Sequence, residues 1–234
     1  MILAAGRGER MRPLTDHTPK PLLEVGGKPL IVWHIERLAA AGFRELVINI
    51  AYLGEKIEAR LGCGATWGVD IAYSRESGEA LETGGGIRQA LDLLGPGAFA
   101  VVNADVWTEY PFDRLLREPG DLAHVVLVDN PPHHPDGDFF LEDGLLRNQP
   151  MDPASAKLTF SGIGVYRPEL FAACDVGRFP LAPLLRARFD QGLIGGEHYR
   201  GAWSDIGTPR RLEALDRQLR RSGRDGHRDG LQVS

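Results

Sequence analysis

The chain has 234 residues and a formal net charge of −5, with 43% hydrophobic and 25% charged residues. These ordinary globular values exclude general disorder and predict one domain, since a chain of this length can bury a sizeable core. The acidic balance without a basic tail argues against a nucleic-acid partner, and the lack of a signal peptide or a long apolar run predicts a cytoplasmic protein that does not enter membranes.

The first half of the chain alternates short apolar runs with helical patterns, which predicts βαβ units on a parallel sheet. Residues 1–4 are predicted to form a strand, and because this is short for a central strand we expect the native start to lie a few residues upstream. Pro29 and Gly42 bound the first predicted helix, since proline favours the first helical turn and glycine the end. Further strands are predicted at 46–50, 69–73 and 99–103, and further helices at 55–61 and 86–94.

The second half is less regular. Strands are predicted at 122–128, 157–166 and 192–199, and helices at 179–189 and 209–220. We expect a single α/β domain over residues 1–221, with a mixed, mostly parallel sheet flanked by helices, and a flexible tail over 222–234. The sequence leaves the oligomeric state open, and a monomer fits.

The segment 3–23 combines glycines with cations. Gly6 and Gly8 follow the first strand directly, where glycine lets backbone N–H groups turn toward a phosphate chain. Residues 1–28 hold five Lys and Arg against three Asp and Glu, a local excess that favours a polyanion over a merely solvated turn. Met11 stands where a dinucleotide fingerprint needs glycine, and the chain has no Walker A sequence, so both of those nucleotide classes are disfavoured.

Residues 3–15 and 19–23 resemble the signature LAAGxGxRxxPLT and PKPLL of the sugar-1-phosphate nucleotidyltransferases. The resemblance implies the Rossmann-like (GT-A-like) nucleotidyltransferase fold and the joining of a nucleoside triphosphate to a sugar 1-phosphate. It implies two catalytic residues, of which Arg10 holds the departing pyrophosphate and Lys20 the α-phosphate region. The residues that it places along the nucleotide are Leu3, Ala4, Ala5, Gly6 and Gly8.

Residues 79–86 resemble the base-reading loop of the same family, which commonly runs Leu-Gly-Thr before a helix. An ordinary strand-to-helix turn is the alternative. Glu82 stands where a glycine is common, which leaves the choice of base open. The resemblance implies nucleotide contacts from Glu79, Glu82, Thr83, Gly84 and Gly85.

Two aspartates are expected to hold Mg²⁺. Asp105 follows the strand 99–103, at the edge where open α/β sheets bind ligands. Asp205 lies in a turn before the last helix, where capping that helix is the alternative. The family's Ala-Asp and Trp-x-Asp-x-Gly-Thr motifs imply that both are metal ligands, that Asp105 also meets the sugar phosphate and that Asn103 meets the nucleotide. Carboxylates with substrate phosphates are ligands that Mg²⁺ prefers.

The sugar site is less defined by the resemblance. Many relatives carry a Glu-Lys pair here, whereas this chain has Arg147-Asn148-Gln149-Pro150, so Arg147 and Lys157 stay open as alternatives beside Gly162. The short chain and the stretches LETGGG, NADVWT and FSGIGVY look most like family members that make UDP-N-acetylmuramate in peptidoglycan recycling. The expected substrates are therefore UTP and N-acetylmuramate α-1-phosphate.

Other functions remain open from the sequence. A guanylyl-, thymidylyl- or cytidylyltransferase acting on mannose or glucose 1-phosphate is the enzyme alternative, and a non-catalytic nucleotide-sugar-binding regulator is the alternative of another class. A glycosyltransferase would use Asp136 and Asp138, which mimic a DxD motif in a Pro-rich loop. We interpret this loop, which includes His133, as solvated surface. The same interpretation applies to the arginines of the last helix, which include Arg211.

Overall fold

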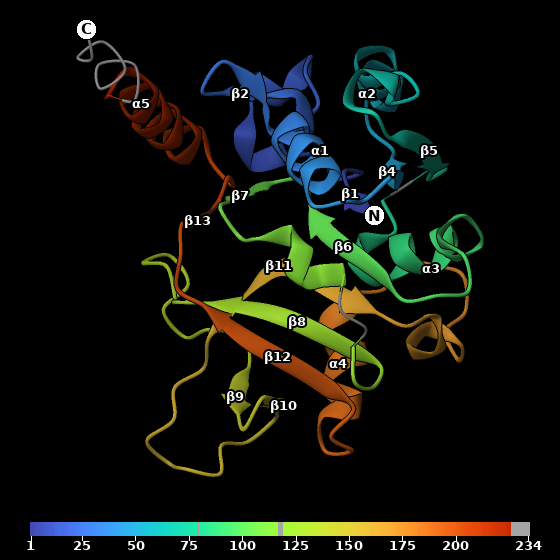
Figure 1. The fold of residues 1–234 in the computed structure, drawn as a ribbon, viewed down its shortest axis with the longest axis vertical. Coiled ribbons are helices and arrows are strands. Elements are labelled where there is room, and N and C mark those ends of the chain that lie inside the picture. The colour runs from blue at the N-terminus through green and yellow to red at the C-terminus, as the bar shows by residue number, and fades with distance from the viewer. Residues whose placement is uncertain (79, 117–118, 226–234) are drawn as a thin grey trace, which may run out of the picture.

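The computed structural model describes residues 1–78, 80–116 and 119–225, with side chains up to 221. One mixed sheet crosses this part of the chain in the order β5-β4-β1-β6-β11-β8-β12-β10-β9 (Figure 1). In this sheet β11 and β10 are antiparallel to the other strands, which all run in one direction. Its strands are β1 (Ile2–Leu3), β4 (Glu45–Ile50), β5 (Asp70–Arg75), β6 (Phe99–Asn103), β8 (Ala123–Val128), β9 (Phe140–Glu142), β10 (Leu145–Arg147), β11 (Thr159–Tyr166) and β12 (Ile194–Tyr199). The predicted α/β class with a mostly parallel mixed sheet is confirmed.

The strand order reverses at β1, the first strand of the chain. From β1 the chain passes through α1 (Leu30–Ala40) to β4 on one side, and later through α3 (Glu82–Leu94) to β6 on the other side. Leu3 pairs with Asn49 and with Asn103, so the carboxyl ends of the three parallel strands lie together. Such a switch point leaves a crevice at the ends of the strands.

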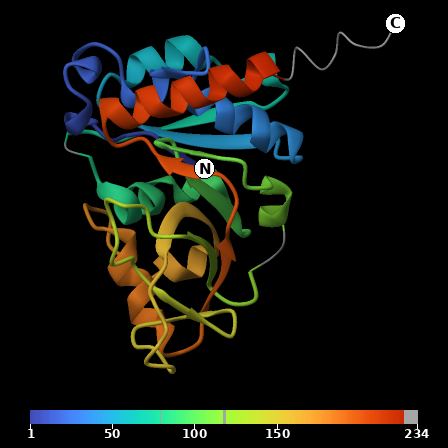
Figure 2. The same cartoon turned by 90° about the vertical axis from the view of Figure 1, so that its left-hand side faces the viewer.

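Helices cover both faces of the sheet (Figure 2). On one face α1 and α2 (Gly54–Leu61) bury Ile31, Ile35 and Ile57 against β1 and β4. On the other face α3 and α4 (Leu181–Phe189) pack against β6 and β8. Burial of these apolar side chains is the main force that holds the layers together.

The last helix, α5 (Pro209–Asp225), joins a third apolar cluster with the N-terminal hairpin of β2 (Glu24–Val25) and β3 (Lys28–Pro29). It continues past residue 221, where the domain was expected to end. The remainder of the expected tail, residues 226–234, lies outside the described residues. Among the described residues, no helix combines the length and apolar character needed to cross a membrane.

One predicted helix begins earlier in the structure, and several short strands were not predicted. Helix α3 begins at Glu82, so the triple glycine lies inside its first turns and not before it. The short strands β7 (Val106–Thr108) and β13 (Trp203–Asp205) pair antiparallel beside the main sheet, and neither was predicted because three residues carry no readable alternation. The hairpin of β9 and β10 was missed for the same reason.

Candidate active site

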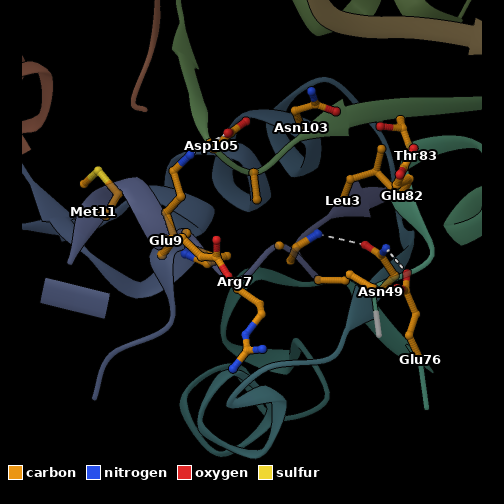
Figure 3. Close-up of a pocket in the computed structure, with 18 of the residues that line it drawn as sticks. Leu3, Arg7, Glu9, Met11, Asn49, Glu76, Glu82, Thr83, Asn103 and Asp105 are labelled. Carbon is orange, nitrogen blue, oxygen red and sulfur yellow. Dashed lines mark hydrogen bonds and ion pairs between the residues drawn. The ribbon is translucent and has the colours of Figure 1, made fainter. Parts of the chain in front are cut away.

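A cavity of about 560 Å³ opens at the carboxyl ends of β1, β4 and β6 (Figure 3). The fold thus brings together segments from both halves of the chain at the switch point. The residues singled out from the sequence that line the cavity are Leu3, Ala4, Ala5, Gly6, Gly8, Arg10, Lys20, Glu82, Thr83, Asn103 and Asp105. Glu79, also singled out, lies outside the described residues.

The loop after β1 is shaped by Gly8, whose φ of +65° lies in the left-handed region. Its carbonyl accepts hydrogen bonds from the Thr15 hydroxyl at 2.8 Å and from the Met11 amide at 2.9 Å. A Cβ at Gly8 would lie 3.1 Å from the Cβ of Lys20 and from a methyl group of Thr15. Glycine therefore allows both the turn and the close passage of Lys20 beside it.

Lys20 is 8% exposed, and its ammonium lies 2.5 Å from a carboxylate oxygen of Asp105. Asp105 follows β6, so this ion pair joins the glycine loop to the opposite side of the switch point. The Asp105 side chain is 41% exposed and faces the cavity, where ligands can reach it. A nearly buried cation and an accessible carboxylate thus meet at one point.

The floor of the cavity holds a buried polar network that the sequence did not reveal (Figure 3). Asn49, at the end of β4, accepts a hydrogen bond from the Ala4 amide at 2.7 Å and donates one to Glu76 at 2.6 Å. The other oxygen of Glu76 accepts a hydrogen bond from the Leu81 amide at 2.7 Å. Both side chains are nearly buried, so their satisfied hydrogen bonds fix the loop ends at the cavity. The one available signal was that Asn49, a polar residue, interrupts the apolar run of β4.

Glu82 differs from the family pattern, and its backbone gives the physical reason why glycine suits the position. Its φ of +61° lies in the left-handed region that glycine adopts without strain. Its carboxylate forms an ion pair of 2.9 Å with Arg178, which comes from the segment before α4 and also lines the cavity. Arg178 was not singled out from the sequence, because only the tertiary fold brings it to the loop.

Gly84 and Gly85 do not line the cavity. They lie in α3 against the segment 177–179, where the Gly85 amide donates a hydrogen bond to the Phe179 carbonyl. A Cβ at Gly85 would lie 2.1 Å from the Gly177 carbonyl oxygen, and one at Gly84 would lie 2.5 Å from the Phe179 ring. These glycines therefore serve a close packing contact in this structure.

Gly162 lies in β11, next to Asn103 of the neighbouring strand β6. Its φ is +79°, and a Cβ there would lie 2.6 Å from the Asn103 side-chain nitrogen. Gly162 thus gives the Asn103 amide its space and does not itself line the cavity.

Arg147 and Lys157 are not brought to the cavity either. Arg147 lies in β10 and pairs with Glu142 at 3.6 Å, and the Lys157 ammonium lies 5.5 Å from the centre of the Phe140 ring. Both positions belong to the far edge of the sheet, which the sequence could not place relative to β1.

Main-chain contacts hold the segment of Asp205 next to that of Asp105. It pairs with Val106 across β7 and β13, and the Ile206 amide donates a hydrogen bond of 2.7 Å to the Asp105 carbonyl. Its carboxylate does not line the cavity, and Arg211 donates to both of its oxygens at 2.7 and 2.6 Å. His133 lies 2.9 Å from the same carboxylate. The interpretation of Arg211 as solvated surface is therefore wrong, since its side chain is only 21% exposed, whereas His133 is exposed as expected.

The chain belongs to the nucleotidyl transferase family, whose model matches residues 1–139. It is 54% identical over 220 residues to the N-acetylmuramate alpha-1-phosphate uridylyltransferase of Neisseria meningitidis, and the match covers 91% of this chain and 94% of that one. It is 36% identical to the protein of the same name from Caulobacter vibrioides, over 94% of this chain and 96% of that one. The family expected from the sequence is confirmed.

The fold is also similar to that of a Bacillus anthracis protein assigned as a glucose-1-phosphate thymidylyltransferase. The TM-score is 0.82 at 22% identity, and the similarity covers 94% of each chain. At this identity the similarity concerns the arrangement of the strands and helices alone.

Proposed function

We propose that the protein joins UTP and N-acetylmuramate α-1-phosphate to form UDP-N-acetylmuramate and pyrophosphate, in the recycling of peptidoglycan. The cytoplasm, the source of nucleoside triphosphates, is the compartment that fits this proposal. The observation that carries it is the contact between Lys20 and Asp105 beside the glycine loop, in a cavity at the switch point of the sheet. Identity of 54% along nearly the whole of a relative with that name supports the choice of substrates.

The chemistry needs little proton transfer. A sugar 1-phosphate has a second pKa near ~6, so at pH 7 its oxygen is mostly deprotonated and can attack the α-phosphorus in line. The protein must bring two anions together and offset the charge that develops on the departing pyrophosphate. In this proposal Lys20 binds at the α-phosphate and Arg10, which also lines the cavity, binds the pyrophosphate.

Members of this family generally use a divalent metal, and we propose Mg²⁺ for this chain. Asp105 fits as a ligand because its carboxylate is half-exposed at the cavity. Asp205 fits as a second ligand once its carboxylate leaves Arg211. No group of three or more His, Cys, Asp or Glu in the described residues suits a metal, which agrees with an ion that takes further ligands from phosphates and water. When bound, Mg²⁺ supplies charge that stabilises the phosphate oxygens.

A grid of reactions tests the proposal. Pyrophosphate release is measured for UTP, dTTP, CTP and GTP, each with N-acetylmuramate, mannose and glucose 1-phosphates. We expect the highest kcat/KM for UTP with N-acetylmuramate α-1-phosphate. A maximum at another pair would assign the chain to another nucleotidyltransferase, and no release in any pair would favour a non-catalytic binding protein.

Asp105→Asn separates the site from other acidic residues. We expect this variant to lose pyrophosphate release by about 10²-fold or more, because an amide is a poor metal ligand and does not pair with Lys20. Asp136→Asn is the matched control, since Asp136 is exposed in the loop after β8. Loss of activity in the control with retention in Asp105→Asn would move the chemistry to the DxD-like loop and contradict the proposal.

A further inference from the structure

Each of the two carboxylates proposed to hold the metal is occupied by a side-chain cation of the chain itself. The Lys20 ammonium lies 2.5 Å from Asp105. The Arg211 guanidinium contacts both oxygens of Asp205, and these two side chains are only 21% and 26% exposed. The two carboxylates and the two cations together carry no formal net charge. A metal ion that binds without nucleotide is therefore not attracted by a net negative charge.

Arg211 lies at the edge of the cavity although it comes from α5. Gly207 lines the cavity, and a Cβ there would lie 2.2 Å from Nη2 of Arg211 and 3.4 Å from Nη2 of Arg10. The two guanidinium groups therefore approach the same glycine from opposite ends of the sequence. A polyanion in the cavity would attract Arg211 as well as Arg10.

His133 forms a third contact in this cluster and ties the loop after β8 to it. Its Nε2 lies 2.9 Å from Asp205 and 2.5 Å from the Arg211 guanidinium. A single ring nitrogen can accept from Arg211 or donate to Asp205, but it cannot do both at once. His133 therefore has a hydrogen-bond partner in both states: Arg211 or Asp205 while Arg211 stays, and Asp205 once Arg211 has moved away.

We propose that Arg211 is an internal counter-cation that keeps Asp205 closed to metal until a nucleoside triphosphate draws the guanidinium away, with Lys20 acting in the same way on Asp105. The proposal rests on the function proposed above and adds that metal and nucleotide bind with strong positive coupling. Arginine suits this role because its guanidinium is more weakly hydrated than an ammonium, and because Nη1 donates to both Asp205 oxygens while Nη2 lies beside Gly207. Arg211 is a positioning residue here, since it acts through Asp205.

Binding of Mn²⁺ to the metal-free protein, measured by electron paramagnetic resonance of the free ion, tests this without turnover. Wild type is expected to bind Mn²⁺ weakly alone and much more tightly with the non-reactive analogue α,β-methylene-UTP. Arg211→Gln is expected to raise the affinity for Mn²⁺ alone by about tenfold and to weaken the coupling to the analogue. Arg210→Gln, at the exposed neighbouring position on α5, is expected to behave as wild type.

Arg211→Lys keeps a positive charge on this side chain but lacks the second nitrogen that lies beside Gly207. This variant carries the test if the glutamine variant does not fold, as judged by thermal unfolding. It is expected to raise Mn²⁺ affinity by less than the glutamine variant does. Unchanged affinity for Mn²⁺ alone in every folded Arg211 variant would overturn the proposal. A wild type that releases no pyrophosphate with N-acetylmuramate α-1-phosphate would refute the proposed function alone, because the Mn²⁺ comparison without nucleotide needs no substrate.

Discussion

Lys20 and Asp105 are separated by 85 positions in the chain, yet their charged groups lie 2.5 Å apart. The contact exists because β1 and β6 are parallel neighbours, so the loop that follows one strand meets the residues that follow the other. A lysine that is 8% exposed would be costly without such a partner. The ion pair therefore links the order of the strands to the electrostatics of the cavity.

Replacing Lys20 tests its assigned role. Lys20→Met is expected to lower kcat for pyrophosphate release by about 10²-fold or more, because a fixed cation at developing charge contributes on that scale. Steady-state kinetics with the preferred substrate pair give the value. Lys56→Met is the control, since Lys56 is exposed on α2, and an equal loss in both variants would contradict a specific role for Lys20.

Gly162 is expected to be required because it leaves space for the side chain of Asn103. Gly162→Ala combines a φ of +79° with a Cβ that would lie 2.6 Å from the Asn103 amide, so we expect it to lower the free energy of unfolding by at least about 2 kcal/mol. Gly27→Ala has a φ of +78° with no atom within 4 Å, and it isolates the backbone strain alone, about 1 kcal/mol. Urea unfolding of both variants gives the difference. Equal losses would show that Asn103 yields easily.

Gly85 tests whether the start of α3 depends on close backbone packing. In most helices Gly→Ala stabilises by about 1 kcal/mol, but here a Cβ would lie 2.1 Å from the Gly177 carbonyl oxygen. Gly85→Ala is therefore expected to destabilise the protein by about 2 kcal/mol or more in the absence of any ligand. Gly97→Ala, where no atom lies within 4 Å, should be neutral or slightly stabilising. Thermal and urea unfolding compare the two, and a Gly85→Ala variant as stable as wild type would contradict the packing role.

The lowered pKa of His34 makes the free energy of unfolding depend on pH. Desolvation by complete burial lowers its pKa from 6.5 to about 4, against an opposing hydrogen bond to the Val106 carbonyl at 2.8 Å. The unfolded chain therefore binds a proton more readily than the folded one. Its contribution to stability is complete above pH 6.5 and is lost as the pH falls toward 4, by roughly 3 kcal/mol in all.

Urea unfolding between pH 8 and pH 4 measures this contribution. His34→Gln keeps a donor for the Val106 carbonyl but has no charge change in this range, so its stability should fall less steeply than that of wild type. The difference between the two proteins removes the effect of other titrating groups. Parallel curves for the two would show that His34 is not the source.

The α/β class and the phosphate-binding loop could be predicted from the sequence, because both depend on local signals. Alternating apolar runs and helix boundaries locate β4, β6 and α1 within a residue or two. Gly8 and Lys20 are recognisable because the cationic glycine turn and the following Pro-Lys-Pro match the motif of the family that the sequence resembles. The rule that open α/β sheets bind ligands at the carboxyl ends of their strands also places Asp105 at the cavity, whereas the order of the strands was not predicted.

The remaining parts of the site depend on contacts between distant segments. The network of Asn49 and Glu76 and the pair of Glu82 and Arg178 join residues whose proximity no periodicity encodes. The hydrophilic character of Arg211 suggested solvent, because an arginine on a charged helix is usually exposed. Its actual partner is a carboxylate presented by a three-residue strand that has no sequence pattern.

The pairing of β7 with β13 has a consequence for biosynthesis. A nascent chain that has left the ribosome as far as α4 already contains the glycine loop, Lys20 and Asp105, but Val106–Thr108 has no partner strand until Trp203–Asp205 emerges. The main-chain contact between the segments of Asp105 and Asp205 therefore forms only after β13 has been translated. Premature termination between β12 and β13 would release a polypeptide that contains every strand of the main sheet yet lacks Asp205.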